Sequence, residues 1–292
     1  MRVLVTGSSG HLGEALVRTL RDLEHEVVGL DVLPSPFTTR VGSITDRSCV
    51  MDCMIGVRTV FHTATLHKPH VATHRRQDFV DTNVTGTLNL LEVAVAAGVR
   101  SFVYTSTTSV FGDALVPPAG APAAWVTEEV TPIPRNIYGV TKAAAEDFCQ
   151  IFNRNHGLAS IVLRTSRFFP EEDDDSAVRE AYADANIKVN EYLYRRVDLE
   201  DVVSAHLLAA ERAPALGFRR SVRLRPLRPA TSRTCGPPPR APRAVAFLFM
   251  RQNTRAGAGG WSRASIASMS TNGPAMSSAG SRAAISSSSS TA

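Results

Sequence analysis

The stretch Arg2-Val3-Leu4-Val5-Thr6-Gly7-Ser8-Ser9-Gly10-His11-Leu12-Gly13 near the start of the chain decides the fold. Its apolar, β-branched beginning predicts a buried strand, and the helical spacing of apolar residues over 12–23 predicts a helix. Between the two, the chain has to turn tightly and approach a bound group closely, and both demands favour glycine. The N-terminus of the helix would then face that group with free N–H groups, which suits a pyrophosphate. The alternative is a glycine turn that binds nothing.

The next predicted strand, over 26–30, is followed directly by Asp31. A carboxylate at this position can bind both ribose hydroxyls of a dinucleotide and repel a 2′-phosphate, so it predicts NAD rather than NADP. The cofactor residues expected from these two segments are Gly7, Ser9, Gly10, His11, Leu12, Gly13 and Asp31.

Strands and helices alternate along most of the chain. Further strands are predicted over 38–44, 59–62, 101–105 and 159–164, and helices after 46 and over 78–97, 136–155 and 198–212. This alternation predicts an α/β fold, a Rossmann-like doubly wound parallel sheet with helices on both faces. The Pro- and Ala-rich segment 113–134 is expected to form a loop over the site.

The sequence predicts three regions of different character. Residues 1–166 are expected to form an NAD-binding Rossmann domain, and 167–218 a small, incomplete substrate-binding region. Residues 219–292 form an Arg/Pro/Ser-rich tail, in which the pattern indicates neither helix nor strand.

The charge divides unevenly between these regions. The whole chain has a net charge of +5, from 32 basic and 27 acidic residues. The tail holds 12 arginines and no Lys, Asp or Glu, so 20 basic and all 27 acidic residues remain in 1–218, a net charge of −7. No aromatic interleaving or recognition motif accompanies the arginines. We therefore expect neither a nucleic-acid nor a membrane partner.

The sequence also favours a cytoplasmic location. It contains no apolar run of about 20 residues, the length that spans a bilayer. A strand that begins at Arg2 leaves no room for a signal peptide. The four cysteines lack zinc or thioredoxin spacing, which indicates reduced thiols.

Several segments, taken in order over residues 1–212, support a family resemblance. They are the Gly-x-x-Gly-x-x-Gly loop at 7–13, Phe61-His62-Thr63-Ala64, Asn83 in Asn-Val-Thr-Gly-Thr, 104–112 (Tyr-Thr-Ser-Thr-Thr-Ser-Val-Phe-Gly), Tyr138-Gly-Val-Thr-Lys142 and 197–202 (Val-Asp-Leu-Glu-Asp-Val). In this combination the chain resembles the extended short-chain dehydrogenase/reductase family, the NAD-dependent epimerases and dehydratases. Each motif alone is weak.

The resemblance implies a catalytic group. Tyr138 and Lys142 lie four residues apart on a predicted helix and share a face. Tyrosine, with a pKa near 10, is a poor base at neutral pH, but a lysine ammonium and a positive nicotinamide nearby favour the phenolate. Tyr138 is then the base, Lys142 also binds the nicotinamide ribose, and Thr107, three residues before Val110, holds the substrate oxygen. Ser106 is the second candidate for that hydroxyl.

The resemblance also implies cofactor contacts from Ala64, Asn83 and Thr105, together with Tyr138 and Lys142. It implies oxidoreductase chemistry of the epimerase/dehydratase type on a small molecule, a sugar nucleotide or a similar secondary alcohol, and it allows a homodimer. Two departures leave the substrate open: Ser43 stands where the family often has aspartate, and 164–169 lacks the usual proline or asparagine. The alternatives are a carbonyl or alcohol reductase on the same fold, and a catalytically silent, truncated NAD-binding protein.

No metal site is expected. His67, His70 and His74 could be ligands, but Pro69 interrupts the helix and no carboxylate partner is evident, so a polar loop near the substrate mouth is the better interpretation. The acidic run 171–175 is interpreted as a solvated face rather than a cation site.

The tail lacks the helices, and the terminal motif like Glu-Leu-Gly-Trp, that the resemblance implies. Arginine, proline, alanine and serine without acidic residues are typical of GC-rich DNA translated out of phase. With permitted codons for 264–280, reading from the third base of the first codon gives IDRVYVNERARDELGW, and the same offset over 230–236 permits DLADLR. We therefore hypothesise that the tail is frame-shifted; a genuine disordered basic tail is the alternative.

Overall fold

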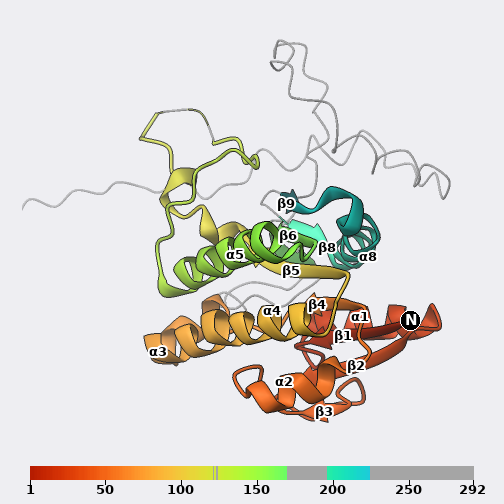
Figure 1. The fold of residues 1–292 in the computed structure, drawn as a ribbon. Helices are drawn as coiled ribbons and strands as arrows, with labels where there is room; N and C mark the ends of the chain where they lie inside the picture. Colours follow the sequence, from red (N-terminus) through yellow and green to blue (C-terminus); the bar gives the residue numbers. More distant parts are fainter. Residues whose placement is uncertain (121, 123, 170–195, 224–292) are drawn as a thin grey trace, which may run out of the picture. The chain divides into compact units, whose positions relative to one another are not determined.

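The computed structural model describes residues 1–120, 122, 124–169 and 196–223. Seven parallel strands form one sheet in the order β3-β2-β1-β4-β5-β6-β9 (Figure 1). The strands are β1 (Arg2–Thr6), β2 (Glu26–Asp31), β3 (Arg40–Val41), β4 (Thr59–His62), β5 (Ser101–Thr107), β6 (Ser160–Thr165) and β9 (Phe218–Arg223). A second sheet pairs β7 (Arg167–Phe169) with β8 (Arg196–Asp198).

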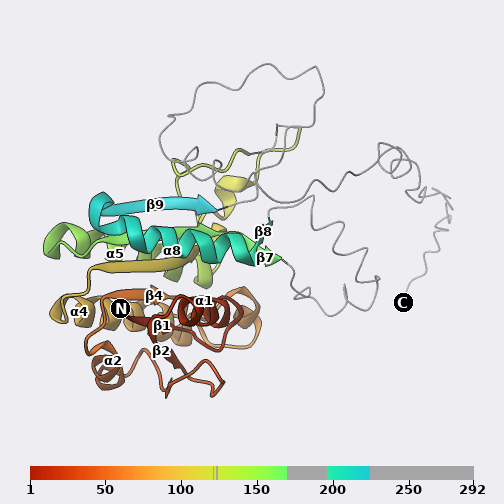
Figure 2. The same ribbon diagram turned by 90° about the vertical axis from the view of Figure 1, so that its right-hand side faces the viewer.

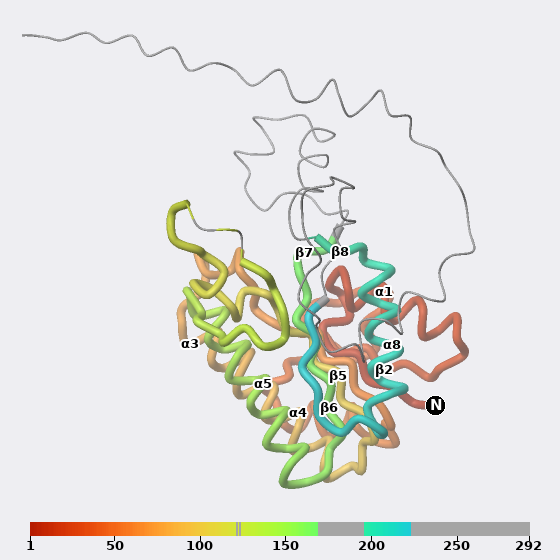
Figure 3. Tube along the Cα trace, turned by 90° about the horizontal axis from the view of Figure 1, so that it is seen from above, coloured from red at the N-terminus to blue at the C-terminus, as the bar shows by residue number. Residues whose placement is uncertain are grey.

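Helices cover both faces of the large sheet, as the sequence predicts for a doubly wound fold (Figures 2 and 3). On one face lie α1 (His11–Asp22) and α8 (Leu199–Leu216). On the other lie α2 (Arg47–Met54), α4 (Gly86–Ala96) and α5 (Ile137–His156). Because both faces are covered, the central strands are buried throughout, and β4 and β6 have no exposed residue.

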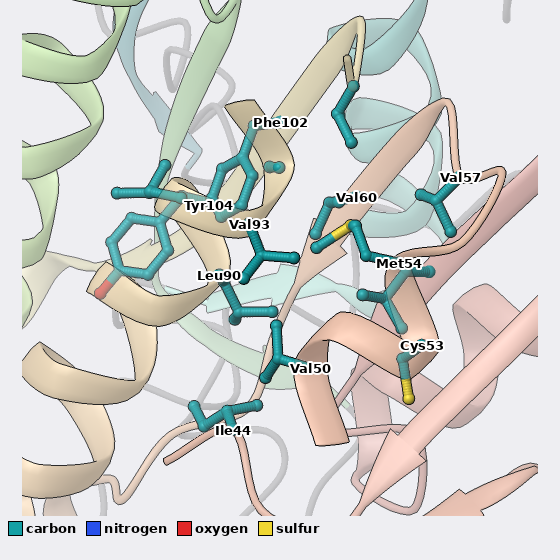
Figure 4. Packing of buried hydrophobic residues seen from close by; sticks show 14 of the residues in the cluster. Ile44, Val50, Cys53, Met54, Val57, Val60, Leu90, Val93, Phe102 and Tyr104 are labelled. Atoms are coloured by element: carbon teal, nitrogen blue, oxygen red, sulfur yellow. The ribbon is translucent and has the colours of Figure 1, made fainter. Parts of the chain in front are cut away.

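The core therefore has two layers. Figure 4 shows the layer under α2 and α4, where Met54, Leu90 and Phe102 pack together with Val60 of β4. In the other layer Leu16 of α1 belongs to the same buried cluster as α8 and alternate residues of the strands. Each strand gives successive side chains to opposite layers, which explains its continuous apolar sequence.

Local signals fix several helix ends. Asp46 begins α2 by accepting hydrogen bonds from the backbone N–H groups of Ser48 and Cys49, and Asn136 begins α5 by accepting one from Gly139. Gly157 ends α5 with φ of 70°, a left-handed conformation that costs glycine little. These ends agree with the predicted helix over 136–155 to within about a residue.

The predicted helix over 78–97 is divided in the structure. It consists of α3 (Arg76–Phe79), a π-helical segment η2 (Val80–Thr85) and α4. The short helices η1 (Lys68–Ala72), η3 (Thr108–Val110) and η4 (Asp113–Leu115) were not predicted. The predicted strand over 38–44 is shorter, with only Arg40 and Val41 paired to β2.

The largest difference from the sequence prediction is β9. The tail was expected to begin at 219 without strand structure, yet β9 runs to Arg223 and pairs with β6 in parallel. One of its arginines has acidic partners from another element: Arg220 forms ion pairs with Glu146 and Asp147 of α5. The backbone N–H of Val222 donates to Glu128 Oε1 at 2.9 Å. Local composition alone did not reveal these partners.

The predicted boundary at 166/167 also needs correction for the described residues. The substrate-binding region was expected over 167–218, but α8 packs on the large sheet and β9 extends it, so both belong to the nucleotide-binding architecture. Only β7 and β8 stand apart from that sheet. The acidic run 171–175 and the tail from 224 onward lie outside the described residues.

Among the described helices, none has the length and apolar character needed to cross a membrane.

Candidate functional site

A cavity of about 1070 Å³ opens at the carboxyl ends of the central strands. It is bounded by the glycine loop after β1, by Asp31 after β2, by the segment after β4, by the end of β5 and by α5. In a doubly wound sheet this edge is where ligands bind. The predicted site residues in its lining are Gly7, Ser9, Gly10, His11, Leu12, Gly13, Asp31, Ala64, Thr105, Ser106, Thr107, Tyr138 and Lys142.

The glycine loop is packed so closely that side chains are excluded. Gly7 has φ of +75°, and a Cβ there would lie 2.7 Å from the backbone nitrogen of Ala64. A Cβ on Gly13 would lie 1.9 Å from the carbonyl oxygen of Gly7. Gly10 is the N-cap of α1 and supplies no side-chain acceptor. The positive end of the α1 dipole therefore faces the cavity without a side-chain cap, an arrangement that fits a dinucleotide pyrophosphate.

Asp31 is held in place by the same loop. Its Oδ2 accepts a hydrogen bond from the backbone N–H of Ser9 at 3.0 Å, and its Oδ1 accepts one from Leu33 at 2.9 Å. Each carboxylate oxygen has a second lone pair, so the group can still accept from ribose hydroxyls. The residues at this end of the cavity therefore fit the adenosine half of NAD.

Tyr138, Thr107 and Lys142 meet at the other end of the cavity, and all three are buried. Burial raises the pKa of Tyr138 to about 12, while a hydrogen bond with Thr107 lowers it. The sequence predicted that Lys142 would lower this pKa. In the structure, desolvation outweighs the hydrogen bond, and Lys142 is not among the groups that shift the pKa of Tyr138.

Lys142 is anchored by the backbone of β5. Its Nζ donates to the carbonyl oxygen of Thr105 at 2.6 Å and lies 4.2 Å from the centroid of the Tyr104 ring. Burial lowers the pKa of Lys142 to about 7, and the negative charge of Glu146 opposes this effect. The hydrogen bond to Thr105 therefore fixes the position of Lys142, and the balance between burial and the charge of Glu146 determines its protonation state.

The two candidate hydroxyls differ in their surroundings. Ser106 Oγ donates to Glu146 Oε1 at 2.6 Å, so its proton is directed away from a substrate. Thr107 Oγ1 accepts from the backbone N–H of Ser109 at 3.1 Å and keeps its own proton for another partner. Thr107 is also the residue that forms the hydrogen bond with Tyr138. This geometry favours Thr107 over Ser106 as the substrate hydroxyl.

Comparison with known proteins identifies the family. The model of the NAD dependent epimerase/dehydratase family matches residues 3–217. The chain belongs to this family. The match ends one residue before β9 begins.

Its relatives in the NAD-dependent epimerase/dehydratase family act on different substrates. A 3-beta-hydroxysteroid dehydrogenase of Mycolicibacterium neoaurum is 31% identical over 242 residues, which cover 74% of this chain and 64% of the relative. A UDP-glucose 4-epimerase of Erwinia amylovora is 31% identical over 184 residues, covering 56% of this chain and 52% of the relative. The chain thus spans less than two thirds of the length of these relatives.

Among solved structures, a short-chain dehydrogenase/reductase superfamily protein from Agrobacterium tumefaciens with bound NAD matches with a TM-score of 0.62 and 27% identity. The match covers 76% of this chain and 77% of that protein.

One predicted cofactor residue of this family member does not reach the cavity. Asn83 is buried, and it does not line the cavity. Its Oδ1 accepts from the backbone N–H of Leu66 at 2.9 Å, and its Nδ2 donates to the Leu66 carbonyl and to Thr141 Oγ1. Asn83 therefore holds Leu66 in the cavity wall after β4, and its contact with the cofactor stays a prediction.

None of the described residues of 113–134 is in the cavity lining, so its position over the site stays a prediction. By contrast, His67, His70 and His74 do line the cavity mouth, with ring centroids 4.4 Å apart for the first pair and 4.9 Å for the second. Among the described residues, no group of three His, Cys, Asp or Glu side chains is arranged to hold a metal ion.

The sequence analysis missed the polar groups behind the site. His206 Nε2 lies 2.7 Å from Thr105 Oγ1, and His62 bridges Thr6 of β1 and Thr87 of α4. Glu146 pairs with Arg164, and both are buried. An arginine that directly follows the apolar residues of β6 was the available signal, because a buried charge requires a partner.

Proposed function

We propose that this chain is an NAD-dependent oxidoreductase that acts on a secondary alcohol of a small molecule, with epimerase/dehydratase-type chemistry. One observation carries the proposal: Tyr138, Thr107 and Lys142 line the same cavity as the glycine loop and Asp31. The family membership supports it independently. When bound, NAD would accept a hydride from the alcohol carbon.

Each residue would have a distinct task. The glycine loop and the start of α1 would hold the pyrophosphate, and Asp31 would bind the adenosine ribose and select against NADP. Tyr138 would take the proton of the substrate hydroxyl, while Thr107 hydrogen-bonds the same oxygen. Lys142 would donate hydrogen bonds from its ammonium group to the nicotinamide ribose.

The substrate class has two candidates. A sugar nucleotide is favoured by the UDP-glucose 4-epimerase relative, and epimerisation by this chain would return the hydride to the substrate. A simple alcohol, oxidised with net release of NADH, is favoured by the hydroxysteroid dehydrogenase relative, whose match covers more of this chain than that of the UDP-glucose 4-epimerase, 74% against 56%. A carbonyl reductase is the reverse of this second reaction.

The experiment compares the two classes directly. The purified full chain and a version in which the reading frame of the tail is restored are each tested for NAD and NADP binding, and then for NADH formation or epimerisation on panels of sugar nucleotides and hydroxysteroids. Turnover that falls at least about 100-fold in Tyr138→Phe, with unchanged NAD affinity, is the expected result. Unchanged turnover in that variant would exclude Tyr138 as the base, and tighter binding of NADP than of NAD would exclude the role given to Asp31.

We also propose a cytoplasmic location, supported by the buried, free thiols of Cys49, Cys53 and Cys149. A homodimer stays a prediction.

For the tail we propose that the reading frame shifts only after β9, because Arg220 and Val222 have specific partners in the body of the protein. Sequencing of the gene, with peptide masses from the natural protein, tests this: tail peptides in the printed frame would contradict it. A shifted frame would make this chain a silent NAD-binding protein.

A further inference from the structure

A buried carboxylate lies one helical turn beyond Lys142. Glu146 is on α5, four residues after Lys142 and eight after Tyr138, so the three side chains follow one face of the helix. Glu146 is 1% exposed and does not line the cavity. It therefore cannot touch a ligand, and none of the site roles given above uses it.

Glu146 is surrounded by donors from other elements. Its Oε1 accepts from Ser106 Oγ at 2.6 Å and from Arg164 Nε at 3.0 Å, and its Oε2 accepts from Arg164 Nη2 at 2.6 Å. Arg220 Nε of β9 lies 3.3 Å from Oε2. Both carboxylate oxygens of Glu146 are therefore engaged by donors from β5, β6 and β9.

The Ser106 contact connects Glu146 to the part of β5 that serves the site. The residue before Ser106 is Thr105, whose carbonyl oxygen accepts from Lys142. The residue after it is Thr107, which forms the hydrogen bond with Tyr138. Through one hydroxyl, Glu146 thus fixes the strand that presents both groups.

The groups around Lys142 determine whether its ammonium form is stable in this buried position. Burial opposes the ammonium form of Lys142, and Glu146 and Cys149 of α5 favour it. The other titratable or charged groups packed around this region are His62 of β4, Tyr104 of β5, Tyr138 of α5, Arg164 of β6 and Arg220 of β9. Among these neighbours, Glu146 is the carboxylate, and it is the largest influence that favours the ammonium form of Lys142.

We propose that Glu146 is a positioning residue of this site, which keeps the Lys142 ammonium charged and holds β5 in register through Ser106. The proposal rests on the proposed function in one respect, that Lys142 must be charged to act. A purely structural ion pair would stabilise the fold equally well without influencing Lys142, so the two interpretations differ in a measurable way.

The test is the titration of Lys142 in the full chain without cofactor. The sequence has three lysines, Lys68, Lys142 and Lys188, so the side-chain Nζ signals can be followed by nitrogen NMR and assigned with Lys142→Met. In Glu146→Gln, which keeps the volume and an acceptor for Ser106, we expect the Lys142 pKa to fall by about 1–3. Asp147→Asn is the matched control, because Asp147 is exposed and contacts Arg220 instead; here the titration should not move.

A second variant keeps the proposal testable if Glu146→Gln does not fold. Glu146→Leu/Arg164→Met removes the buried pair together, so neither charge is left unpartnered. The Lys142 pKa should again fall, and Glu146→Asp should restore most of the original value. Unchanged Lys142 titration in every folded variant that lacks the Glu146 charge would overturn the proposal.

The outcome is independent of turnover. A shifted Lys142 titration without activity on any substrate would support the role of Glu146 and count against the proposed function. Activity in the wild type, together with an unshifted Lys142 titration in Glu146→Gln, would support the proposed function and count against the role of Glu146. If the proposed function and the role of Glu146 are both correct, NAD affinity measured by fluorescence should weaken in Glu146→Gln near neutral pH. The affinity should recover at lower pH, where Lys142 is charged again.

Discussion

The two ends of the cavity are built on different principles. The cofactor end consists of backbone: glycines that exclude side chains, the uncapped start of α1, and Asp31 held by two backbone N–H groups. The catalytic end consists of buried ionisable side chains from separate elements, with Tyr138 and Lys142 in front and Glu146 and Arg164 behind them. The first end depends on close packing, and the second depends on paired charges. Substitutions should therefore disrupt them in different ways.

The largest effect is expected behind the catalytic end. Arg164→Met removes the hydrogen bonds from Arg164 to Glu146 and leaves that carboxylate short of partners in a buried site. Breaking a buried pair costs about 3–5 kcal/mol of unfolding free energy. Urea denaturation followed by circular dichroism measures the loss. Arg135→Met, which removes an exposed pair with Asp113, should cost less than about 1 kcal/mol; equal losses would show that burial is not the cause.

At the cofactor end, Gly7→Ala should combine two penalties. The positive φ costs about 1–2 kcal/mol for any other residue, and the contact with the Ala64 backbone adds about 1–3 kcal/mol of overpacking. Gly98→Ala is the matched control, with φ of +67° and no atom within 4 Å of the new Cβ. We expect Gly98→Ala to show only the first penalty and to leave NAD affinity unchanged. If the two variants lose equal stability, close packing does not determine the loop.

The smallest effect links the catalytic end to pH. Because burial lowers the Lys142 pKa from 10.5 to about 7, the unfolded chain binds this proton between those pH values and the folded chain does not. The stability of the fold should therefore rise with pH between these two values. Below pH 7 the fold should bear the full cost of burying the Lys142 ammonium. Lys142→Met should remove this dependence of stability on pH. It should also raise the free energy of unfolding near pH 6, by a value near the lower limit of the range of about 1–4 kcal/mol.

Thermal or urea unfolding of wild type and Lys142→Met from pH 6 to 10 measures this difference. The same comparison with Lys68→Met serves as a control, since Lys68 belongs to a helix without a buried residue. Parallel stability curves for wild type and Lys142→Met would mean that Lys142 keeps its ordinary pKa in the fold.

Contiguous patterns explain why much of this architecture was predictable. β1 and β4 have the predicted bounds, and α5 agrees to within about a residue, because burial on both faces gives a strand an uninterrupted apolar sequence and Asn136 and Gly157 mark the helix ends. The strand β9 was not predicted, because it is rich in arginine and is stabilised by acidic groups distant in sequence. The contacts of Asn83 with the Leu66 backbone were not predicted either, because they depend on the tertiary structure.

The sequence by itself determined the nucleotide-binding end of this protein, because a strand, three glycines and a helix start are local features whose geometry follows from backbone sterics. It also indicated Tyr138 and Lys142 through their helical spacing. Only the tertiary structure decided the electrostatics of the catalytic end: which hydroxyl remains available, which groups shift the pKa of Lys142, and where Arg164 and Arg220 find their partner. The physical reason is that desolvation and charge pairing depend on elements brought together in space, which no single segment of the chain records.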